Sequence, residues 1–203
     1  MTKALILIGF MGAGKSTIGR LIAEKLQRNF IDTDELLQQR QGQTIAAIME
    51  AKGMLGFREA EFDALQAAIQ TGGVIATGGG IIDYEPSFQL LKTTAAQIVY
   101  LHGDFTQHLD RIMRDSQRPL LRTKSITEFV EMWDLRQSKY AVLANVTLSS
   151  FTKAPTDVLL EIEMWLKNPQ TMNQSVSKQL ELKKQIEQVQ QELRMLQELP
   201  VNE

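Results

Sequence analysis

Ala4-Leu5-Ile6-Leu7-Ile8-Gly9-Phe10-Met11-Gly12-Ala13-Gly14-Lys15-Ser16-Thr17 opens with five apolar residues and continues into a glycine-rich loop. A continuous apolar run is typical of a strand that is covered on both faces of a parallel sheet. The residues from Gly9 onward match GxxxxGK[ST], the pattern of a phosphate-binding loop between a strand and a helix. Apolar residues then recur at helical spacing from Ile18 to Leu26. The order of strand, loop and helix therefore predicts an α/β nucleotide-binding fold.

The loop has the composition that phosphate binding needs. Its glycines allow successive backbone N–H groups to face phosphate oxygens, and the following helix adds its positive dipole end. Lys15 can reach the β- and γ-phosphates, and the Ser16 hydroxyl can ligate Mg²⁺. A chance glycine turn is the alternative, which the complete and correctly placed motif disfavours. The residues expected to bind ATP here are Gly12, Ala13, Gly14, Lys15, Ser16 and Thr17.

Strand-like and helix-like segments alternate along the rest of the chain. Short apolar runs predict further strands at 30–31, 74–77, 97–101 and 146–148. Helices are expected at 88–92, 105–114, 126–143 and 156–166, and at 44–70 with interruptions at Gly53 and Gly56. This alternation predicts a doubly wound α/β sheet.

Glycine-rich and polar segments directly follow three of the predicted strands, at 9–16, 32–34 and 78–80. In doubly wound sheets, ligands bind at the carboxyl ends of the strands. We therefore expect these three segments to meet at one edge of the sheet and form a single active site.

The composition restricts the class of partner and the compartment. The 203 residues are 43% hydrophobic, carry a formal net charge of −2 and contain no cysteine. Without a global basic field we expect no nucleic-acid partner, and without cysteine we expect neither disulfides nor thiolate metal sites. No apolar run is long enough to span a bilayer, so we expect no membrane association and a cytoplasmic location.

Asp32 and Asp34 follow the predicted second strand at a spacing of two. In an extended segment both carboxylates would point the same way. A kinase needs carboxylates near the γ-phosphate, for Mg²⁺ with its waters and for the acceptor hydroxyl. Alternatively, Asp34 caps the next helix, and the two roles can coexist.

Arg58 is a candidate for binding a substrate carboxylate. Arg58 follows an aromatic residue and could hold a carboxylate in bidentate fashion, or it could form a surface ion pair with Glu61. Arg136 and Tyr140 lie four apart on one helical face, where a surface position would also explain them. The glycine triplet 78–80 indicates a close approach of backbone to a flat or anionic group.

Further arginines, at 111, 114, 118 and 122, surround a segment with the sequence Asp115-Ser116-Gln117-Arg118-Pro119-Leu120-Leu121. A basic loop there could close over ATP and exclude water from the transferred phosphoryl group. A solvated basic segment without a role is the alternative.

Together these motifs resemble the shikimate kinase family. They are the phosphate-binding loop, Asp32-Thr33-Asp34, Phe57-Arg58-x-x-Glu61, Thr77-Gly78-Gly79-Gly80, Arg118-Pro119-Leu120-Leu121 and Leu135-Arg136-x-x-x-Tyr140. The resemblance covers roughly residues 5–166. It implies a three-layer α/β/α fold with a mainly parallel sheet, a substrate-binding helical region, a kinase domain at 1–168 and a lid at about 112–124. It also implies ATP-dependent phosphorylation of the 3-hydroxyl of shikimate in chorismate and aromatic amino-acid synthesis, with Mg²⁺ arriving with ATP.

The resemblance also implies roles for individual residues. Lys15, Asp34 and Arg118 would be catalytic: Asp34 as the partner of the acceptor hydroxyls and possible base, the other two on the transferred group. The substrate would be bound by Asp34, Arg58, Gly79, Gly80 and Arg136. Ser16 would ligate Mg²⁺, Asp32 would hold a water of its shell, and Arg111 or Arg114 would stack near adenine.

The sequence departs from the family after Pro169, where members of the family usually end. Residues 169–203 predict a helical extension in which Leu182, Ile186, Val189, Leu193 and Leu196 alternate in steps of four and three. The helix would pack on the core or self-associate, so we expect a monomer or a weak homodimer. Gluconate kinase, adenylate-type kinase and a catalytically silent scaffold are the competing hypotheses for function. The combined motifs and the complete set of charged residues disfavour them.

Overall fold

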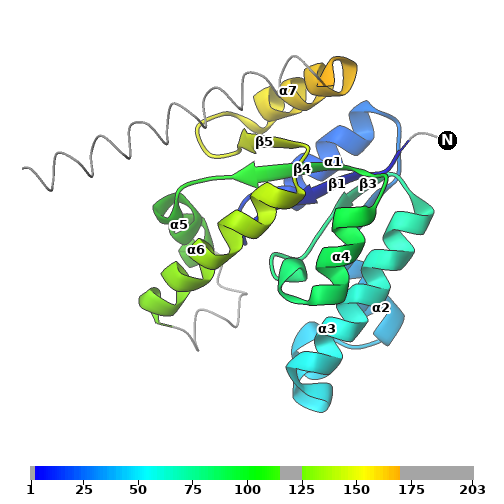
Figure 1. Cartoon of the computed structure of the whole chain (residues 1–203), viewed down its shortest axis with the longest axis vertical. Coiled ribbons are helices and arrows are strands. Elements are labelled where there is room, and N and C mark those ends of the chain that lie inside the picture. Colours follow the sequence, from blue (N-terminus) through cyan, green and yellow to red (C-terminus); the bar gives the residue numbers. More distant parts are fainter. Residues whose placement is uncertain (1–2, 115–124, 170–203) are drawn as a thin grey trace, which may run out of the picture. The chain divides into compact units, whose positions relative to one another are not determined.

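A computed structural model describes residues 3–114 and 125–169 of the chain. Five parallel strands form one sheet in the order β2-β3-β1-β4-β5 (Figure 1). The strands are β1 (Leu5–Ile8), β2 (Phe30–Asp32), β3 (Val74–Ala76), β4 (Gln97–His102) and β5 (Val146–Ser149). The five predicted strands and their parallel arrangement are confirmed, and the order of the strands is new information.

Helices connect the strands. They are α1 (Lys15–Lys25), α2 (Thr33–Gln41), α3 (Ile45–Thr71), the short 3₁₀ helix η1 (Ile81–Asp83), α4 (Glu85–Thr93), α5 (Phe105–Arg114), α6 (Ile126–Leu143) and α7 (Pro155–Lys167). Among the described residues, none of these helices combines the length and the apolar character needed to cross a membrane.

The two faces of β1 bury different helices, as expected for a strand inside a parallel sheet. Ile6 and Ile8 belong to a core that includes residues of α3, α4 and α6. Leu7 points the other way, toward α1, where it lies beside Gly19. Figure 1 shows α1 on one side of the sheet and α3, α4 and α6 on the other. The sheet is thus the middle of three layers, which confirms the predicted α/β/α architecture.

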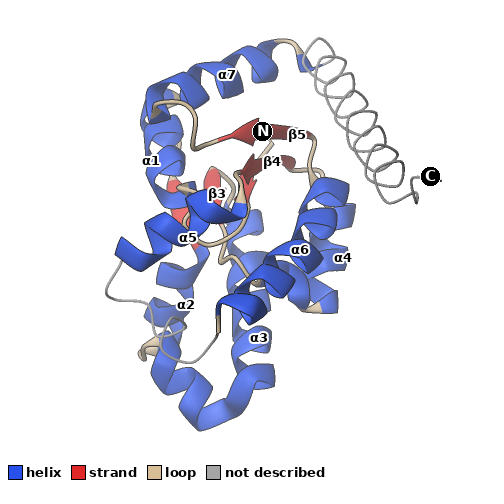
Figure 2. Ribbon diagram, turned by 90° about the vertical axis from the view of Figure 1, so that its left-hand side faces the viewer, coloured by secondary structure: helices blue, strands red, loops and turns tan. Residues whose placement is uncertain are grey.

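Helices α2 and α3 pack against each other and extend away from the sheet (Figure 2). They enclose a smaller apolar core of their own, made of Leu37, Ile48, Phe57, Ala60 and Ala64. This pair is the helical region that the family resemblance implied.

The predicted breaks in the long helix are only half right. The backbone of α3 leaves helical geometry at Gly53, with φ 69° and ψ −175°. It is helical at Gly56, so the predicted interruption there is wrong. Gly56 stays in the helix because a single glycine only weakens helical geometry and does not prevent it.

The chain divides into two units, Met1–Ile162 and Glu163–Glu203. All of the strands, and all of the residues considered below, belong to the first. The predicted helical extension from 170 onward and most of the predicted lid, 115–124, lie outside the described residues. The predicted boundary between 168 and 169 and the predicted self-association therefore stay predictions.

Gly19 provides a test of how closely α1 packs on the sheet. A Cβ at this position would lie 2.5 Å from the ring of Phe30 and 3.1 Å from Leu7. We expect Gly19→Ala to destabilise the protein by about 1–3 kcal/mol, because overpacking outweighs the helix propensity gained.

Urea denaturation of Gly19→Ala, Phe30→Leu and the double variant measures this effect. If the ring of Phe30 is the obstacle, Phe30→Leu costs less stability in the Gly19→Ala background than in the wild type. Additive effects in this cycle would contradict the proposed steric conflict.

Candidate active site

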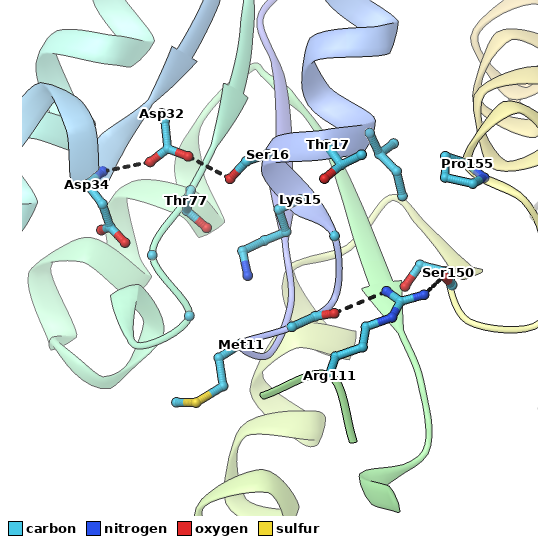
Figure 3. A pocket seen from close by; sticks show the side chains of 15 residues that line it. Met11, Lys15, Ser16, Thr17, Asp32, Asp34, Thr77, Arg111, Ser150 and Pro155 are labelled. Carbon is cyan, nitrogen blue, oxygen red and sulfur yellow. Dashed lines mark hydrogen bonds between the residues drawn. The ribbon is translucent and has the colours of Figure 1, made fainter. Parts of the chain in front are cut away.

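A cavity of about 450 Å³ lies at the carboxyl ends of β1, β2 and β3 (Figure 3). Its walls come from the three segments that the sequence predicted would converge, together with residues from α5 and from the segment after β5. The lining residues are Met11, Gly12, Gly14, Lys15, Ser16, Thr17, Ile18, Asp32, Asp34, Thr77, Gly78, Gly79, Arg111, Ser150 and Pro155. Asp32 and Asp34 lie on one side of Lys15, and Arg111, Ser150 and Pro155 lie on the other (Figure 3).

The phosphate-binding loop takes a backbone course that requires glycine. Gly9 has φ 148°, and a Cβ there would lie 2.5 Å from the carbonyl oxygen of Leu101 in β4. Gly14 has φ 83° and begins α1 without any side-chain cap. The amides of the first turn of α1 are therefore not used by a capping side chain, as an anion site requires.

The buried Lys15 side chain folds back over the loop. Its Nζ donates to the carbonyl oxygens of Gly9 at 2.8 Å and Phe10 at 3.0 Å. Phosphate oxygens would be stronger acceptors for this ammonium group than the two carbonyls are.

Asp32 links the loop to the neighbouring strand. Its Oδ2 accepts a hydrogen bond from the Ser16 hydroxyl at 2.7 Å (Figure 3). Its Oδ1 accepts the backbone N–H of Asp34 at 3.0 Å and thereby caps α2. The prediction that Asp34 caps the helix is thus wrong: Asp34 lies within the first turn of α2, because the helix begins directly after the strand. The two carboxylates do not share an extended segment, yet both line the cavity.

Each residue of the glycine triplet faces a different neighbour, as distances from an added Cβ show. At Gly78 that atom would lie 2.6 Å from Glu61 and 2.7 Å from Asp34. At Gly79 it would lie 3.1 Å from the amide nitrogen of Met11 in the phosphate-binding loop. At Gly80 it would lie 2.4 Å from the guanidinium of Arg58. The predicted close approach of this backbone is confirmed, and all the neighbours seen are parts of the chain itself.

Arg58 pairs with Glu61, as the sequence allowed, but inside the protein. Its Nη1 donates to Glu61 Oε2 at 2.6 Å, with only 15% and 1% of the two side chains exposed. Burial raises the pKa of Glu61 to about 7 although Arg58 acts to lower it, and the nearby Asp34 and Asp83 raise it further. The pair therefore lies inside the protein, close to two further carboxylates, and is not a solvated surface pair.

Arg136 and Tyr140 are also buried, which overturns the alternative of a surface position. Both nitrogens of one edge of the Arg136 guanidinium donate to the carboxylate of Asp83, Nε to Oδ1 at 3.2 Å and Nη2 to Oδ2. One helical turn later, the Tyr140 hydroxyl donates to the carbonyl oxygen of Gly79. Burial raises the pKa of Tyr140, so that its hydroxyl stays protonated. Helix α6 thus fixes the glycine triplet and presents an arginine beside it.

Arg111 closes the other end of the cavity. It donates to the carbonyl oxygens of Gly12 at 3.1 Å and Ser150 at 3.0 Å, and its guanidinium lies 3.8 Å from the centre of the Phe151 ring. Partial burial lowers its pKa. Pro155 lines the same end. Sequence analysis missed residues 150, 151 and 155, because single residues after a weak strand carry no recognisable motif.

Two predicted positions have no described contacts. Arg114 ends α5, and its side chain is not among those described. Arg118, predicted to be catalytic and to bind ATP, lies outside the described residues together with most of the lid.

His108, from α5, contacts the phosphate-binding loop. Its ring is buried, donates a hydrogen bond from Nδ1 to the carbonyl oxygen of Met11 at 3.0 Å, and packs edge-on against Phe10 and Phe151. Because a carbonyl only accepts, Nδ1 must carry the proton and donate. The sequence assigned this histidine no role beyond a structural or surface one, and the structure makes it structural.

The burial of His108 predicts a pH dependence of stability. Burial lowers its pKa to about 4, from an ordinary value of 6.5. Below about pH 6.5 the unfolded chain binds a proton on His108 that the folded protein does not bind. The free energy of unfolding is therefore highest above about pH 6.5 and falls as the pH drops toward 4. This contribution is about 3 kcal/mol for a shift of this size.

Denaturation of wild type and His108→Gln at several pH values measures this contribution, and the difference between them should shrink on acidification. The chain has two histidines. In the variant His102→Gln, NMR therefore follows the ring of His108 alone, and a midpoint near 6.5 would contradict the interpretation.

Comparison with known proteins identifies the family. The family model described as shikimate kinase matches residues 11–167. The shikimate kinase of Sulfurihydrogenibium sp. is 37% identical over 161 residues, which are 79% of this chain and 95% of the relative. That of Pseudomonas paraeruginosa is 40% identical over 160 residues, 78% of this chain and 92% of the relative.

Solved structures agree. Shikimate kinase from Acinetobacter baumannii in complex with shikimate has a TM-score of 0.75 at 35% identity, covering 82% of this chain and 95% of that chain. Shikimate kinase from Aquifex aeolicus has a TM-score of 0.71 at 34% identity, covering 81% and 96%. With this agreement in sequence and fold, and with the predicted loop and the carboxylates Asp32 and Asp34 around one cavity, the chain belongs to the shikimate kinase family.

Proposed function

We propose that the protein transfers the γ-phosphoryl group of ATP to the 3-hydroxyl of shikimate, giving shikimate 3-phosphate and ADP in chorismate and aromatic amino-acid synthesis. The observation that carries this proposal is the pair of arginines, the buried Arg136 and the partly buried Arg58, which converge on one carboxylate beside a phosphate-binding loop. Shikimate has a carboxylate and hydroxyls, and the relative from Acinetobacter baumannii holds shikimate.

ATP would lie along the cavity with its phosphates on the loop. The amides of Gly12, Ala13, Gly14, Ser16 and Thr17 would face the phosphates at the start of α1. Lys15 would exchange its two carbonyl partners for β- and γ-phosphate oxygens. The adenine would lie at the end formed by Arg111 and Pro155. Arg111 lines this end, Arg114 stays the alternative candidate for stacking near adenine, and Arg118 stays a candidate for charge stabilisation from the lid.

Shikimate would occupy the end of the cavity near Asp34. Arg58 and Arg136 would hold its carboxylate, and the backbone of Gly79 and Gly80 would line its ring. Asp34 would accept hydrogen bonds from the hydroxyls. As the 3-oxygen forms its bond to the γ-phosphorus and the bond from phosphorus to the β-phosphate oxygen breaks, the hydroxyl proton passes to Asp34. The rate would come mainly from positioning and from charge stabilisation.

The oxygen donors beside the phosphate-binding loop are of the kind that binds Mg²⁺. The Ser16 hydroxyl and the Asp32 carboxylate lie 2.7 Å apart and are hard oxygen donors, the type that Mg²⁺ prefers. Ser16 would ligate the ion directly and Asp32 would hold one of its waters. When bound, the ion neutralises charge on the β- and γ-phosphates. The cytoplasmic location and the oligomeric state expected from the sequence stay predictions.

A coupled ADP-release assay with MgATP tests the function, with shikimate, gluconate and AMP as alternative acceptors. We expect turnover with shikimate only, and a loss of at least about a hundredfold in kcat for Asp34→Asn, in line with the contribution of a general base. Glu35→Gln, which removes the same charge from the neighbouring exposed residue, should leave kcat within about twofold. ATP binding without turnover on any acceptor would refute the assignment.

The two roles of Asp32 can be separated by two substitutions. Asn caps a helix as well as Asp does, so Asp32→Asn should keep the stability, whereas Asp32→Ala should lose about 1 kcal/mol. Both variants lose the carboxylate charge, and both should need more Mg²⁺ for half-maximal activity. Thermal unfolding and a Mg²⁺ titration of kcat measure the two effects. An unchanged Mg²⁺ requirement in Asp32→Asn would leave Asp32 with the capping role alone.

A further inference from the structure

The two arginines proposed for the substrate carboxylate already hold a carboxylate of the protein. Asp83 Oδ2 accepts from Nη2 of Arg136 and lies 3.5 Å from Nη2 of Arg58, and Asp83 Oδ1 lies 3.2 Å from Nε of Arg136. One carboxylate therefore bridges two guanidinium groups. This is the arrangement that a bound carboxylate substrate would adopt with the same residues.

Arg58 and Arg136 have few guanidinium N–H groups left that could bind a second carboxylate. Arg136 uses a full edge, Nε and Nη2, on Asp83. Arg58 gives Nη1 to the buried Glu61, and its guanidinium rests against Gly80. Arg58 cannot rotate away from the triplet without losing the contact with Glu61. A second carboxylate can use the facing edges of both arginines only if Asp83 leaves them.

The position of Asp83 allows its carboxylate to move away from the two guanidinium groups. It is the last residue of η1, and the next residue, Tyr84, is extended, with φ −93° and ψ 117°. About a third of its side chain, 34%, is exposed, compared with 8% for Arg136 and 15% for Arg58. The arginines are fixed inside the protein and Asp83 lies at the surface, so it is the aspartate that can turn toward solvent at little cost.

We propose that Asp83 is an internal competitor for the carboxylate site: it occupies Arg58 and Arg136 in the substrate-free protein and must be displaced by the substrate. This inference rests on the proposed function, since it assigns the two arginines to the substrate carboxylate. Asp83 thereby sets the affinity of the site and its selectivity among carboxylates.

The selectivity follows from the exchange. A simple carboxylate replaces one ion pair with an equivalent one and gains little. Shikimate replaces the same ion pair and also gains the hydroxyl contacts to Asp34, so it can displace Asp83. The internal carboxylate also gives the buried Arg136 an ion-pair partner and places a negative charge between Arg136 and Arg58, which itself pairs with Glu61; a buried cation without a partner would be costly in the interior.

Calorimetric titration with cyclohex-1-enecarboxylate, which has the ring and carboxylate of shikimate without its hydroxyls, tests the proposal. If Asp83 competes, Asp83→Asn and Asp83→Ala bind this probe about three- to tenfold more tightly than the wild type, because a larger fraction of the protein has a free site. The KM for shikimate falls by a similar factor while kcat stays unchanged. Glu85→Gln removes the same charge two residues away from an exposed side chain and should change neither affinity nor KM.

The other outcomes overturn the proposal. Weaker binding of the probe in both Asp83 variants would mean that Asp83 only positions the arginines. Equal tightening in Glu85→Gln would mean a general effect of charge. Absence of turnover with shikimate in the wild type would refute the proposed function instead, and the probe titration would still rank the variants, because it requires only the two arginines.

Discussion

The backbone at Gly78–Gly80 lies against three other segments of the chain, and it can do so only because these residues have no side chains. Gly78 meets Glu61 and Asp34, Gly79 meets the amide of Met11, and Gly80 meets the guanidinium of Arg58. None of the three has a positive φ, so the triplet is required for space and not for conformation. A methyl group at Gly78 or Gly80 would push apart a carboxylate or an arginine that the proposed chemistry needs.

Around this backbone the charges form a compact network that extends from the buried Glu61 and Arg136 to Asp83 at the surface. Arg58 and Arg136 share Asp83, and Arg58 also pairs with Glu61. Burial raises the pKa of Glu61, and the guanidinium of Arg58 acts against this rise. The ion pairs with Asp83 and Glu61 orient the two arginines before any substrate arrives. In such a site binding is an exchange of partners and not the burial of a new charge.

The phosphate-binding loop is held from both sides by residues distant in the sequence. His108 donates to the carbonyl of Met11, and Arg111 donates to that of Gly12. The ring of Phe151 contacts both side chains. One turn of α5 and the segment after β5 therefore stabilise the loop whose amides must face the phosphates. Preorganised amides need no rearrangement when charge develops on the transferred group.

Short-range patterns in the sequence determined much of this protein. The apolar run before Gly9, the complete GxxxxGK[ST] motif and the polar segments after three strands predicted the class of fold and the edge of the sheet that carries the site. These features are local, because a strand, a glycine turn and a helix start each depend on neighbouring residues. The tertiary structure alone decided the strand order and that Asp32 rather than Asp34 caps α2. It alone brought Asp83, His108 and Pro155 to the site. Those outcomes depend on contacts between residues far apart in the chain, where one side chain after a strand looks like any other until the sheet and the helices bring it to its neighbours.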